Sequence, residues 1–342
     1  MGKVAEHSIL LIGAGDMGTQ HAKAWAAIGQ PIAAIVDMDE ARLHRLSDTH
    51  AVDRRFTCYE DAMAEMHDAD IVDICLPLAF HLPVTVQACA AKKHVLCEKP
   101  LARSLDEADR MDQAVKAAGI KFAVGFQRNL PPWVNFLRQD VQAGHFGHPL
   151  LFTCDSMAEV RPKRFMHDRY GNNGPVVDLL QHYFLLWETV FDAKPVDVAA
   201  FGFIAAHDRP EIAQFPEKAI DTAVVTIRYT SGDVGSVTVS WGLAAGSRIA
   251  EAPDRLIGPK RVAMPAASPG GGWTLYEGAH EVHQPFPQVN AHALQAQAFI
   301  DYVDGRREEP PSSLAVGRHL LHLSLAALRS IETGRVVEIS ET

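Results

Sequence analysis

The sequence predicts an α/β protein in two parts: a doubly wound parallel sheet, followed by an α+β domain with a large open, mostly antiparallel sheet. Two observations support this prediction. Up to about residue 126, apolar runs alternate with helical segments, a pattern typical of parallel strands joined by right-handed crossovers. Beyond that point, period-two alternation of apolar and polar residues predominates, as in antiparallel strands with one solvated face.

The first element is a short apolar strand that leads into a glycine-rich turn. Residues 7–12 are followed by Gly13, Gly15 and Gly18, and a helix is expected over 19–28. The three glycines suit a tight turn, a close approach of backbone to a pyrophosphate, and close packing of helix on strand, in that order. The helix N-terminus adds unpaired N–H groups for the phosphates. This pattern predicts a Rossmann domain that binds a dinucleotide.

The second strand, residues 32–36, ends on Asp37, nineteen positions after Gly18. A carboxylate at this place accepts hydrogen bonds from the adenosine ribose hydroxyls and repels a 2′-phosphate. The sequence therefore predicts NAD as the cofactor in preference to NADP, although Arg42 lies nearby in the sequence.

The rest of the N-terminal domain, 1–126, continues the alternation. Helices are expected at 40–50, 61–67, 83–92 and 104–118, and strands at 70–75, 94–97 and 121–126. Ser104 is expected to cap the last of these helices, with Glu107 three residues later and Gly119 as its stop.

The second domain is expected to span 127–342. Strands at 223–229 and 234–241 flank a Thr-Ser-Gly-Asp turn and predict an antiparallel hairpin. Further strands are expected at 150–154, 196–203, 255–264 and 273–276, with helices at 133–143, 291–304 and 316–332. The open face of such a sheet predicts a homo-oligomer, either a dimer or a tetramer.

Composition narrows the class of protein. The 342 residues carry a net charge of −10, which argues against nucleic acid or an anionic membrane as a partner. No apolar run approaches a membrane span, and no signal peptide is recognisable. The five cysteines lack Cys-x-x-Cys spacing and the histidines are scattered, so we expect reduced thiols, a cytoplasmic location and no metal site.

One candidate chemical group is Glu98-Lys99-Pro100, directly after the strand at 94–97. At the carboxyl end of that strand, a lysine can hydrogen-bond a substrate hydroxyl or a developing alkoxide. Glu98 can pair with the ammonium group, and Pro100 favours extended geometry at Lys99. The alternative is that Lys99 is a solvated charge at a strand end.

A second candidate group is Asp178 with His182, on a helix that Pro175 is expected to begin. Four residues apart on one helix, the two side chains share a face. Histidine suits removal of a hydroxyl proton because its ordinary pKa lies near neutrality. The alternative is an ordinary Asp/His pair on a solvated helix.

These features recur in the order of a known family. The glycine turn, Cys75-Leu76-Pro77 with His81 after it, residues 93–102 and the Asp178/His182 helix resemble the glucose–fructose oxidoreductase / inositol 2-dehydrogenase (Gfo/Idh/MocA) family of nicotinamide-dependent oxidoreductases. The resemblance covers nearly the whole chain. It implies oxidation and reduction at a secondary alcohol of a sugar, polyol, sugar acid or related cyclic hydroxy compound.

The resemblance also implies roles for individual residues. Lys99, Asp178 and His182 form the catalytic trio, with His182 as proton acceptor. With the glycine turn, the cofactor-binding residues become Gly13, Gly15, Asp16, Met17, Gly18, Asp37, Cys75, Leu76, Pro77, His81, Glu98, Lys99 and Arg128. His21 is expected to be structural. The family's glycine-rich approach to the Asp178 helix is replaced here by residues 172–175, Asn-Asn-Gly-Pro.

A cationic stretch, residues 161–170, precedes that helix in an otherwise acidic chain. One hypothesis is that some of its basic side chains grip a carboxylate or phosphate of the substrate. They are Arg161, Lys163, Arg164 and Arg169, of which Arg161 and Arg164 are the chief candidates for substrate binding alongside Asp178 and His182. The alternative is a solvated loop or a subunit contact.

Two other functions stay open. One is an enzyme that keeps its NAD(H) bound and uses transient oxidation to isomerise, eliminate or cleave a glycosidic bond. The other is a regulator that senses the dinucleotide without catalysis. The complete trio of Lys99, Asp178 and His182 argues against the regulator, because a sensor needs no proton acceptor.

Overall fold

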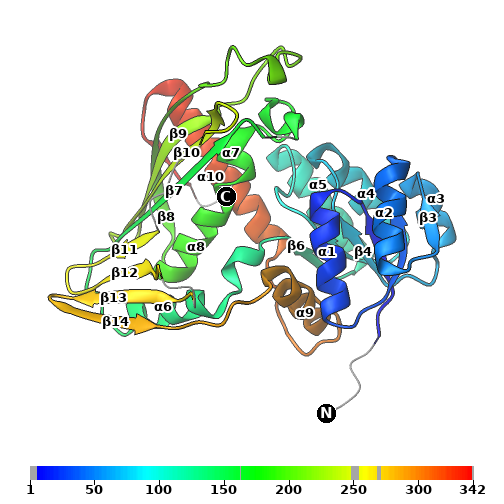
Figure 1. The fold of residues 1–342 in the computed structure, drawn as a ribbon, viewed down its shortest axis with the longest axis horizontal. Helices are drawn as coiled ribbons and strands as arrows, with labels where there is room; N and C mark the ends of the chain where they lie inside the picture. The colour runs from blue at the N-terminus through cyan, green and yellow to red at the C-terminus, as the bar shows by residue number, and fades with distance from the viewer. Residues whose placement is uncertain (1–5, 162, 248–253, 268–270, 341–342) are drawn as a thin grey trace. The chain divides into compact units, whose positions relative to one another are not determined.

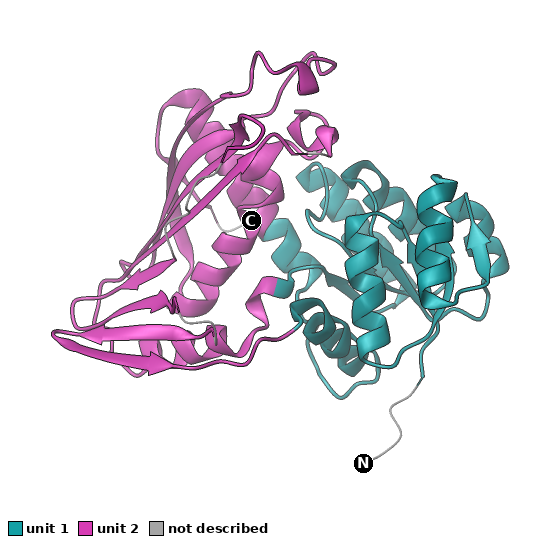
Figure 2. Cartoon of the chain, in the orientation of Figure 1, with its two compact units in different colours: residues 1–127, 290–319 teal, residues 128–289, 320–342 magenta. Residues whose placement is uncertain are grey.

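The computed structural model describes residues 6–161, 163–247, 254–267 and 271–340. Its chain divides into two units, coloured teal and magenta in Figure 2. Unit 1 comprises residues 1–127 and 290–319, and unit 2 comprises residues 128–289 and 320–342. Residues 290–319, which were expected in the second domain (127–342), therefore belong to the N-terminal unit.

Unit 1 is built on a parallel sheet whose six described strands follow the order β3-β2-β1-β4-β5-β6. The strands are β1 (Ile9–Ile12), β2 (Ile32–Val36), β3 (Arg54–Phe56), β4 (Ile71–Ile74), β5 (His94–Cys97) and β6 (Phe122–Val124). This order, which runs outward in both directions from β1, is that of the Rossmann fold. The expected doubly wound sheet is confirmed, and ligands of such sheets bind at the carboxyl ends of the strands.

The helices of unit 1 match the sequence pattern closely. They are α1 (Asp16–Ala27), α2 (Glu40–His50), α3 (Tyr59–Glu65), α4 (His81–Ala90), α5 (Leu105–Ala118) and α9 (Ala291–Val303), labelled in Figure 1. Ser104 caps α5 as predicted, since its hydroxyl accepts from the Glu107 N–H at 3.2 Å. Gly119 follows in the left-handed region, with φ of 66°.

Strand β3 was missed by the sequence analysis because it is a three-residue edge strand with two arginines and no apolar run. Helix α9 was assigned to the wrong unit. Its Phe299 and Ile300 pack in one buried cluster with Trp25 of α1 and Ile9 of β1. This burial holds α9 against the dinucleotide-type sheet, and nothing in the periodicity of residues 291–304 indicates which sheet it covers.

Unit 2 contains a mixed sheet with nine strands among its described residues, in the order β14-β13-β12-β11-β7-β10-β9-β8-β15. They are β7 (Leu151–Glu159), β8 (Pro195–Phe203), β9 (Thr222–Tyr229), β10 (Val234–Leu243), β11 (Arg255–Ile257), β12 (Val262–Pro265), β13 (Trp273–Glu277), β14 (His280–Gln284) and β15 (Val337–Glu338). Among the described residues, the strand pairs of this sheet are antiparallel apart from the parallel pair β7–β10. The mostly antiparallel sheet is confirmed, although the expected strand 255–264 is a hairpin of two strands.

The two faces of this sheet differ in what they pack against. The helices of the unit are α6 (Pro132–Gln142), α7 (Gly174–Asp178), α8 (Gln181–Phe191) and α10 (Leu314–Thr333), with the unit boundary inside α10. Helices α7, α8 and α10 lie along one face (Figure 1), where Val198, Val225 and Val237 are buried. On the other face Phe201 is 73% exposed, beside Val224 on the neighbouring strand.

The length and apolar character of the helices were compared with what a membrane span requires. Among the described residues, none of them is both long enough and apolar enough to cross a lipid bilayer.

Candidate functional site

The glycine turn has the backbone that its sequence predicts. Gly13 has φ of +106°, and a Cβ there would lie 2.4 Å from the Cys75 carbonyl oxygen. A Cβ on Gly18 would lie 1.8 Å from the Gly13 carbonyl oxygen, so helix α1 packs directly on the turn. A Cβ on Gly15 would meet nothing within 4 Å. The turn is therefore closed by protein at two glycines and open at the third, as pyrophosphate binding at the start of α1 requires.

Asp37 ties the end of β2 to this turn. One of its carboxylate oxygens accepts from the Ala14 N–H at 2.8 Å, and the other accepts from the Asp39 N–H at 2.9 Å. The Arg42 guanidinium lies 3.4 Å from the second oxygen. The carboxylate is thus held at the strand tip where an adenosine ribose binds in this fold, next to a cation.

The loops after β4 and β5 are joined by His81. This buried side chain at the start of α4 places Nδ1 2.9 Å from the Pro100 carbonyl oxygen and Nε2 3.0 Å from that of Leu76. Burial lowers the pKa of His81. Its observed contacts are with the loop that carries Cys75, Leu76 and Pro77 and with the loop after Lys99, so a contact of His81 with the cofactor stays a prediction.

A charged network that the sequence analysis missed lies beneath these loops. His21 of α1 places Nδ1 2.9 Å from Asp73 on β4 and Nε2 3.0 Å from Glu98 after β5. The Trp25 indole donates to Asp73 at 2.6 Å. Glu98 therefore contacts His21, a partner that the sequence analysis did not predict, and the charge of Lys99, the predicted partner, also lowers the pKa of Glu98. The sequence signal that was overlooked is an acid, Asp73, inside an otherwise apolar buried strand.

Cys75 joins this network at its edge. Its thiol donates to Asp73 at 3.7 Å, and burial with the charge of Asp73 raises the pKa of Cys75 to about 12. The ligand-type atoms of His21, Asp73 and Cys75 lie within 4.8 Å of one another. A neutral thiol and a hydrogen-bonded His–Asp pair account for this cluster without an ion.

Lys99 is half-buried and lies between two well-held residues. The Glu98 N–H donates to the Ile74 carbonyl at 2.9 Å, and the Pro100 carbonyl faces His81. The Lys99–Pro100 peptide bond is cis. Lys99 thus follows β5 at the carboxyl edge of the parallel sheet, as predicted.

In unit 2, Asp178 and His182 are buried, with exposures of 2% and 5%. The expected single helix is wrong, because α7 ends at Asp178 and α8 begins at Gln181. The Leu180 N–H reaches the Pro175 carbonyl, five residues earlier, at 3.0 Å. This π-type step, a feature frequent at functional sites, interrupts the continuous helix that was assumed between the acid and the histidine.

The start of α7 and the two residues before it hold this backbone in place. Asn173 and Gly174 both have positive φ, and a Cβ on Gly174 would lie 2.3 Å from the Ile220 carbonyl oxygen. The Asn172 amide donates to Asp178 at 3.4 Å. The Asn-Asn-Gly-Pro sequence therefore makes a tight left-handed approach in which only one glycine is required, and it contributes a buried partner for Asp178.

The cationic stretch divides in two. Arg169 forms ion pairs with Glu332 at 3.0 Å and Glu217 at 3.8 Å. Arg161 lies over the Trp241 ring, and Arg164 donates to the Arg161 carbonyl at 2.9 Å. Arg161 and Arg164 have no ion pair with any residue that the structure describes. Arg161 and Arg164 therefore stay candidates for binding an anionic group of the substrate, whereas the ion pairs of Arg169 give it a structural role.

The Arg164 turn is connected to the Asp178 loop. Residues Arg164–His167 form a short 3₁₀ helix, and the Asn172 N–H donates to the Phe165 carbonyl at 3.3 Å. Lys163 lies beside this turn. Arg128, the remaining cofactor candidate, is exposed on the 3₁₀ turn Gln127–Asn129, where the structure gives it no assigned role.

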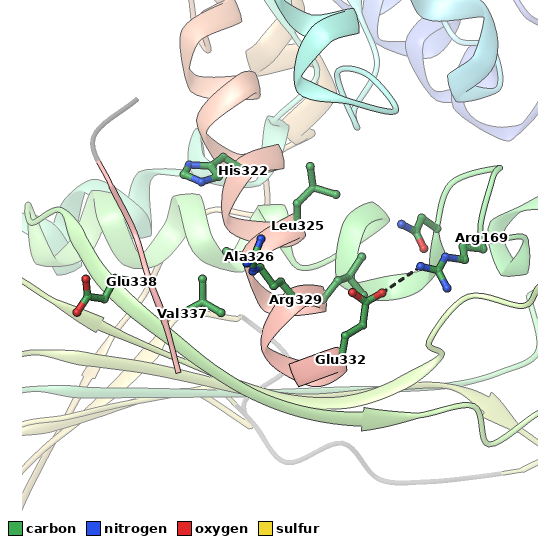
Figure 3. A pocket seen from close by; sticks show the side chains of 10 residues that line it. Arg169, His322, Leu325, Ala326, Arg329, Glu332, Val337 and Glu338 are labelled. Atoms are coloured by element: carbon green, nitrogen blue, oxygen red, sulfur yellow. Dashed lines mark hydrogen bonds and ion pairs between the residues drawn. The ribbon is translucent and has the colours of Figure 1, made fainter. Parts of the chain in front are cut away.

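A cavity of about 660 Å³ lies elsewhere in unit 2, between the end of α10 and β15. Figure 3 shows Arg169 and Glu332 paired at its edge, with His322 and Arg329 from α10. None of its lining residues is a predicted catalytic residue, so we do not assign the reaction to this cavity.

Comparison with known proteins agrees with this architecture. Residues 7–126 match a family model described as an oxidoreductase family with an NAD-binding Rossmann fold, and residues 134–257 match the GFO/IDH/MocA C-terminal domain. The chain is 32% identical over 225 residues to the uncharacterized oxidoreductase YrbE of Bacillus subtilis, covering 65% of this chain and 63% of that protein.

Two further relatives fit the same pattern. The chain is 30% identical over 230 residues to the myo-inositol 2-dehydrogenase of Thermotoga maritima, covering 66% of each chain. An Agrobacterium radiobacter oxidoreductase, solved in complex with NAD+, L-tartaric acid and magnesium, superposes with a TM-score of 0.82 at 21% identity over 98% of each chain. The chain thus spans about two thirds of the length of the two sequence relatives.

Proposed function

The chain belongs to the Gfo/Idh/MocA family of oxidoreductases, whose N-terminal domain is an NAD-binding Rossmann fold, and on that premise we propose that it is an NAD-dependent dehydrogenase. Its reaction interconverts a secondary alcohol and a ketone on a sugar, polyol, sugar acid or related cyclic hydroxy compound. The observation that carries the proposal is the glycine turn, open at Gly15 and anchored by Asp37. That the Thermotoga relative is a myo-inositol 2-dehydrogenase supports a cyclic polyol as the substrate class.

The residues of unit 1 fit a bound dinucleotide. Gly13, Gly15 and Gly18 with the start of α1, at Asp16 and Met17, would hold the pyrophosphate, and Asp37 the ribose. The loops with Cys75, Leu76, Pro77 and Glu98 would line the nicotinamide half. Arg128, which belongs to unit 2, is a further candidate contact. When bound, NAD+ supplies the acceptor for a hydride from the substrate carbon.

Three side chains are proposed for the remaining chemistry. The His182 imidazole takes the proton of the substrate hydroxyl, Lys99 donates a hydrogen bond to the oxygen, and Asp178 orients the imidazole. The proposal requires all three to act on one substrate molecule. The burial of Asp178 and His182, and the tethered backbone on both sides of Lys99, support their selection.

A substrate screen tests the function. Purified protein with NAD+ is offered inositols, aldoses, sugar acids and nucleotide sugars, and reduced nicotinamide is followed by its absorbance. A dehydrogenase produces NADH with at least one class of compound. Cofactor that copurifies, with product formed but no net NADH, would instead identify the enzyme with permanently bound NAD(H). A flat response across the panel, with tight NADH binding, would favour the non-catalytic regulator.

Arg164→Ala tests the proposed anion contact of Arg161 and Arg164. If the substrate carries a carboxylate, we expect kcat/KM for sugar acids to fall about tenfold to a hundredfold, because a hydrogen bond to a charged group is lost. Turnover of neutral polyols should be unchanged. Arg169→Ala is the matched control, since Arg169 is paired with Glu332. An equal effect of Arg164→Ala on acids and neutral polyols would contradict the anion contact.

Asp37→Ala tests the preference for NAD. Removing the carboxylate removes its repulsion of a 2′-phosphate and frees Arg42 to meet one, so the ratio of kcat/KM for NADP+ to that for NAD+ should rise about tenfold or more. Affinity for NAD+ should fall as well, because Asp37 also holds the Ala14 N–H. Asp39→Asn, which keeps the side-chain oxygen that caps α2, is the control. An unchanged ratio in Asp37→Ala would mean that Asp37 does not set the preference for NAD.

We also propose that the protein is a cytoplasmic homo-oligomer. The five cysteines are all free thiols, as suits a reducing compartment. The uncovered face of the unit 2 sheet exposes Phe201 and Phe203 at 73% and 61%, an apolar surface that a second copy of the chain would bury. Light scattering of the purified protein measures whether the assembly is a dimer or a tetramer.

A further inference from the structure

The geometry of His21 determines its charge. Both ring nitrogens face carboxylate oxygens, Nδ1 toward Asp73 at 2.9 Å and Nε2 toward Glu98 at 3.0 Å. A carboxylate only accepts hydrogen bonds, and a neutral imidazole has only one N–H to donate. Both contacts are satisfied together only when the ring carries two protons. The contacts therefore describe an imidazolium between two carboxylates.

The surroundings of His21 agree with this assignment. Burial alone lowers the pKa of His21, but the charge and hydrogen bond of Asp73 raise it well above its ordinary value. For Glu98, burial raises the pKa, but the hydrogen bond and charge of His21, together with the charges of Lys99 and His292, lower it by more, so the net shift is downward. Cys75, directly after β4, and the His292 ring on α9, 5.5 Å from His21, also face it.

The network is fully enclosed by unit 1. Asp73, His21 and Glu98 are 0%, 2% and 3% exposed. A Cβ on Gly125, after β6, would lie 2.5 Å from the Glu98 carboxylate, so that carboxylate occupies the place of a side chain at 125. Charges buried this deeply are costly unless fully paired, and replacing them with apolar groups is often neutral for stability. Their presence under the cofactor loops therefore points to a task other than stability.

We propose that His21 is a positioning residue for Lys99, acting through Glu98, in an inference that rests on the catalytic role proposed for Lys99. Glu98 is pinned twice, by its backbone bond to Ile74 and by its side-chain bond to His21. On the other side of Lys99, His81 holds the Pro100 carbonyl. Lys99 therefore lies between Glu98 and Pro100, and a buried histidine holds each of these two neighbours. The Asp73–His21–Glu98 network fixes the backbone from which the ammonium group reaches the substrate oxygen.

The charge of His21 can be measured without substrate. Nitrogen-15 spectra of the histidine-labelled protein should show His21 with both ring nitrogens protonated at neutral pH and above, with or without NADH. In Asp73→Asn that signal should shift to a neutral ring at neutral pH. A neutral His21 in the wild type, with one nitrogen lacking a proton, would overturn the inference.

Kinetics then separate positioning from simple structural support. His21→Gln keeps a polar side chain that cannot donate to both carboxylates, and kcat should fall about a hundredfold, as for a reacting group misplaced by about 1 Å. KM and the dissociation constant for NADH should stay within about threefold. Leu46→Ala, which truncates another part of the unit 1 core, is the control: it should lower Tm but leave kcat per folded molecule unchanged.

The decisive comparison is a double variant. If His21 acts through Glu98, then His21→Gln adds no further loss of kcat in a Glu98→Gln background, whereas independent effects would multiply. Multiplicative losses, or a wild-type kcat in His21→Gln, would refute the positioning role. Lys99→Met distinguishes the two failures. If it retains turnover, the proposed catalytic role fails; if it is inactive while His21→Gln is normal, only the inference about His21 fails.

Discussion

With methionine in place of Lys99, kcat should fall about a hundredfold to a thousandfold, while the dissociation constant for NADH stays within about threefold. Methionine keeps the length of the lysine stem and removes the charge and the donors. In the proposed reaction, negative charge develops on the substrate oxygen as its proton leaves, and a fixed ammonium stabilises that charge more than it stabilises the neutral hydroxyl. The loss should therefore appear in kcat more than in KM.

The measurement is a steady-state assay with the alcohol that the screen identifies, together with NADH binding followed by fluorescence. Lys116→Ala is the matched control, because Lys116 lies on the surface of α5 and pairs with Asp112, so its removal should change kcat by less than about twofold. If Lys99→Met works at the wild-type rate, Lys99 is only a half-buried strand-end cation, the alternative that its sequence context left open.

The parts of unit 1 that were predictable from sequence are those determined over short distances along the chain. The glycine turn requires particular residues at Gly13 and Gly18 because backbone atoms occupy the space of a side chain there. The cap at Ser104 and the stop at Gly119 are likewise local. Each of these features is specified by a few neighbouring residues, so periodicity and residue type were sufficient to place them.

The features that sequence did not predict depend on distant contacts. His21 meets Asp73 and Glu98 across 52 and 77 positions of sequence, so its role is visible only once α1 lies over β4 and β5. Helix α9 has an apolar face that suits either sheet, and only packing against Trp25 assigns it to unit 1. An acid such as Asp73 within an apolar, buried strand needs a hydrogen-bond partner, and this need was the one sequence signal for the network.

The prediction of one continuous helix across α7 and α8 was wrong for a different reason. Residues 175–184 contain no glycine or proline after Pro175, so propensity favours one continuous helix. The π-type bond from the Leu180 N–H to the Pro175 carbonyl changes the register by one residue. Tertiary packing decides such steps, which is why the sequence did not predict the break in the helix between Asp178 and His182.

His182→Asn should lower kcat about a hundredfold to ten-thousandfold, the range for loss of a general base. Asparagine keeps a polar side chain of similar reach at a buried position but does not accept a proton near neutral pH. The wild-type kcat in the direction of alcohol oxidation should rise with pH as the imidazole loses its proton, and then level off. In His182→Asn that limb should disappear, leaving a low rate that increases with hydroxide concentration.

His207→Asn is the control in the same unit, since the His207 side chain is 66% exposed and should leave both kcat and the pH profile unchanged. Because His182 is buried, Tm and NADH binding must be measured on each variant to show that the folded, cofactor-binding state is retained. A folded variant that keeps the acid limb of the wild type would mean that another group accepts the proton. A folded variant that loses the limb along with turnover identifies His182 as the base, since removing a packing residue alone leaves the ionisation of the true base in place.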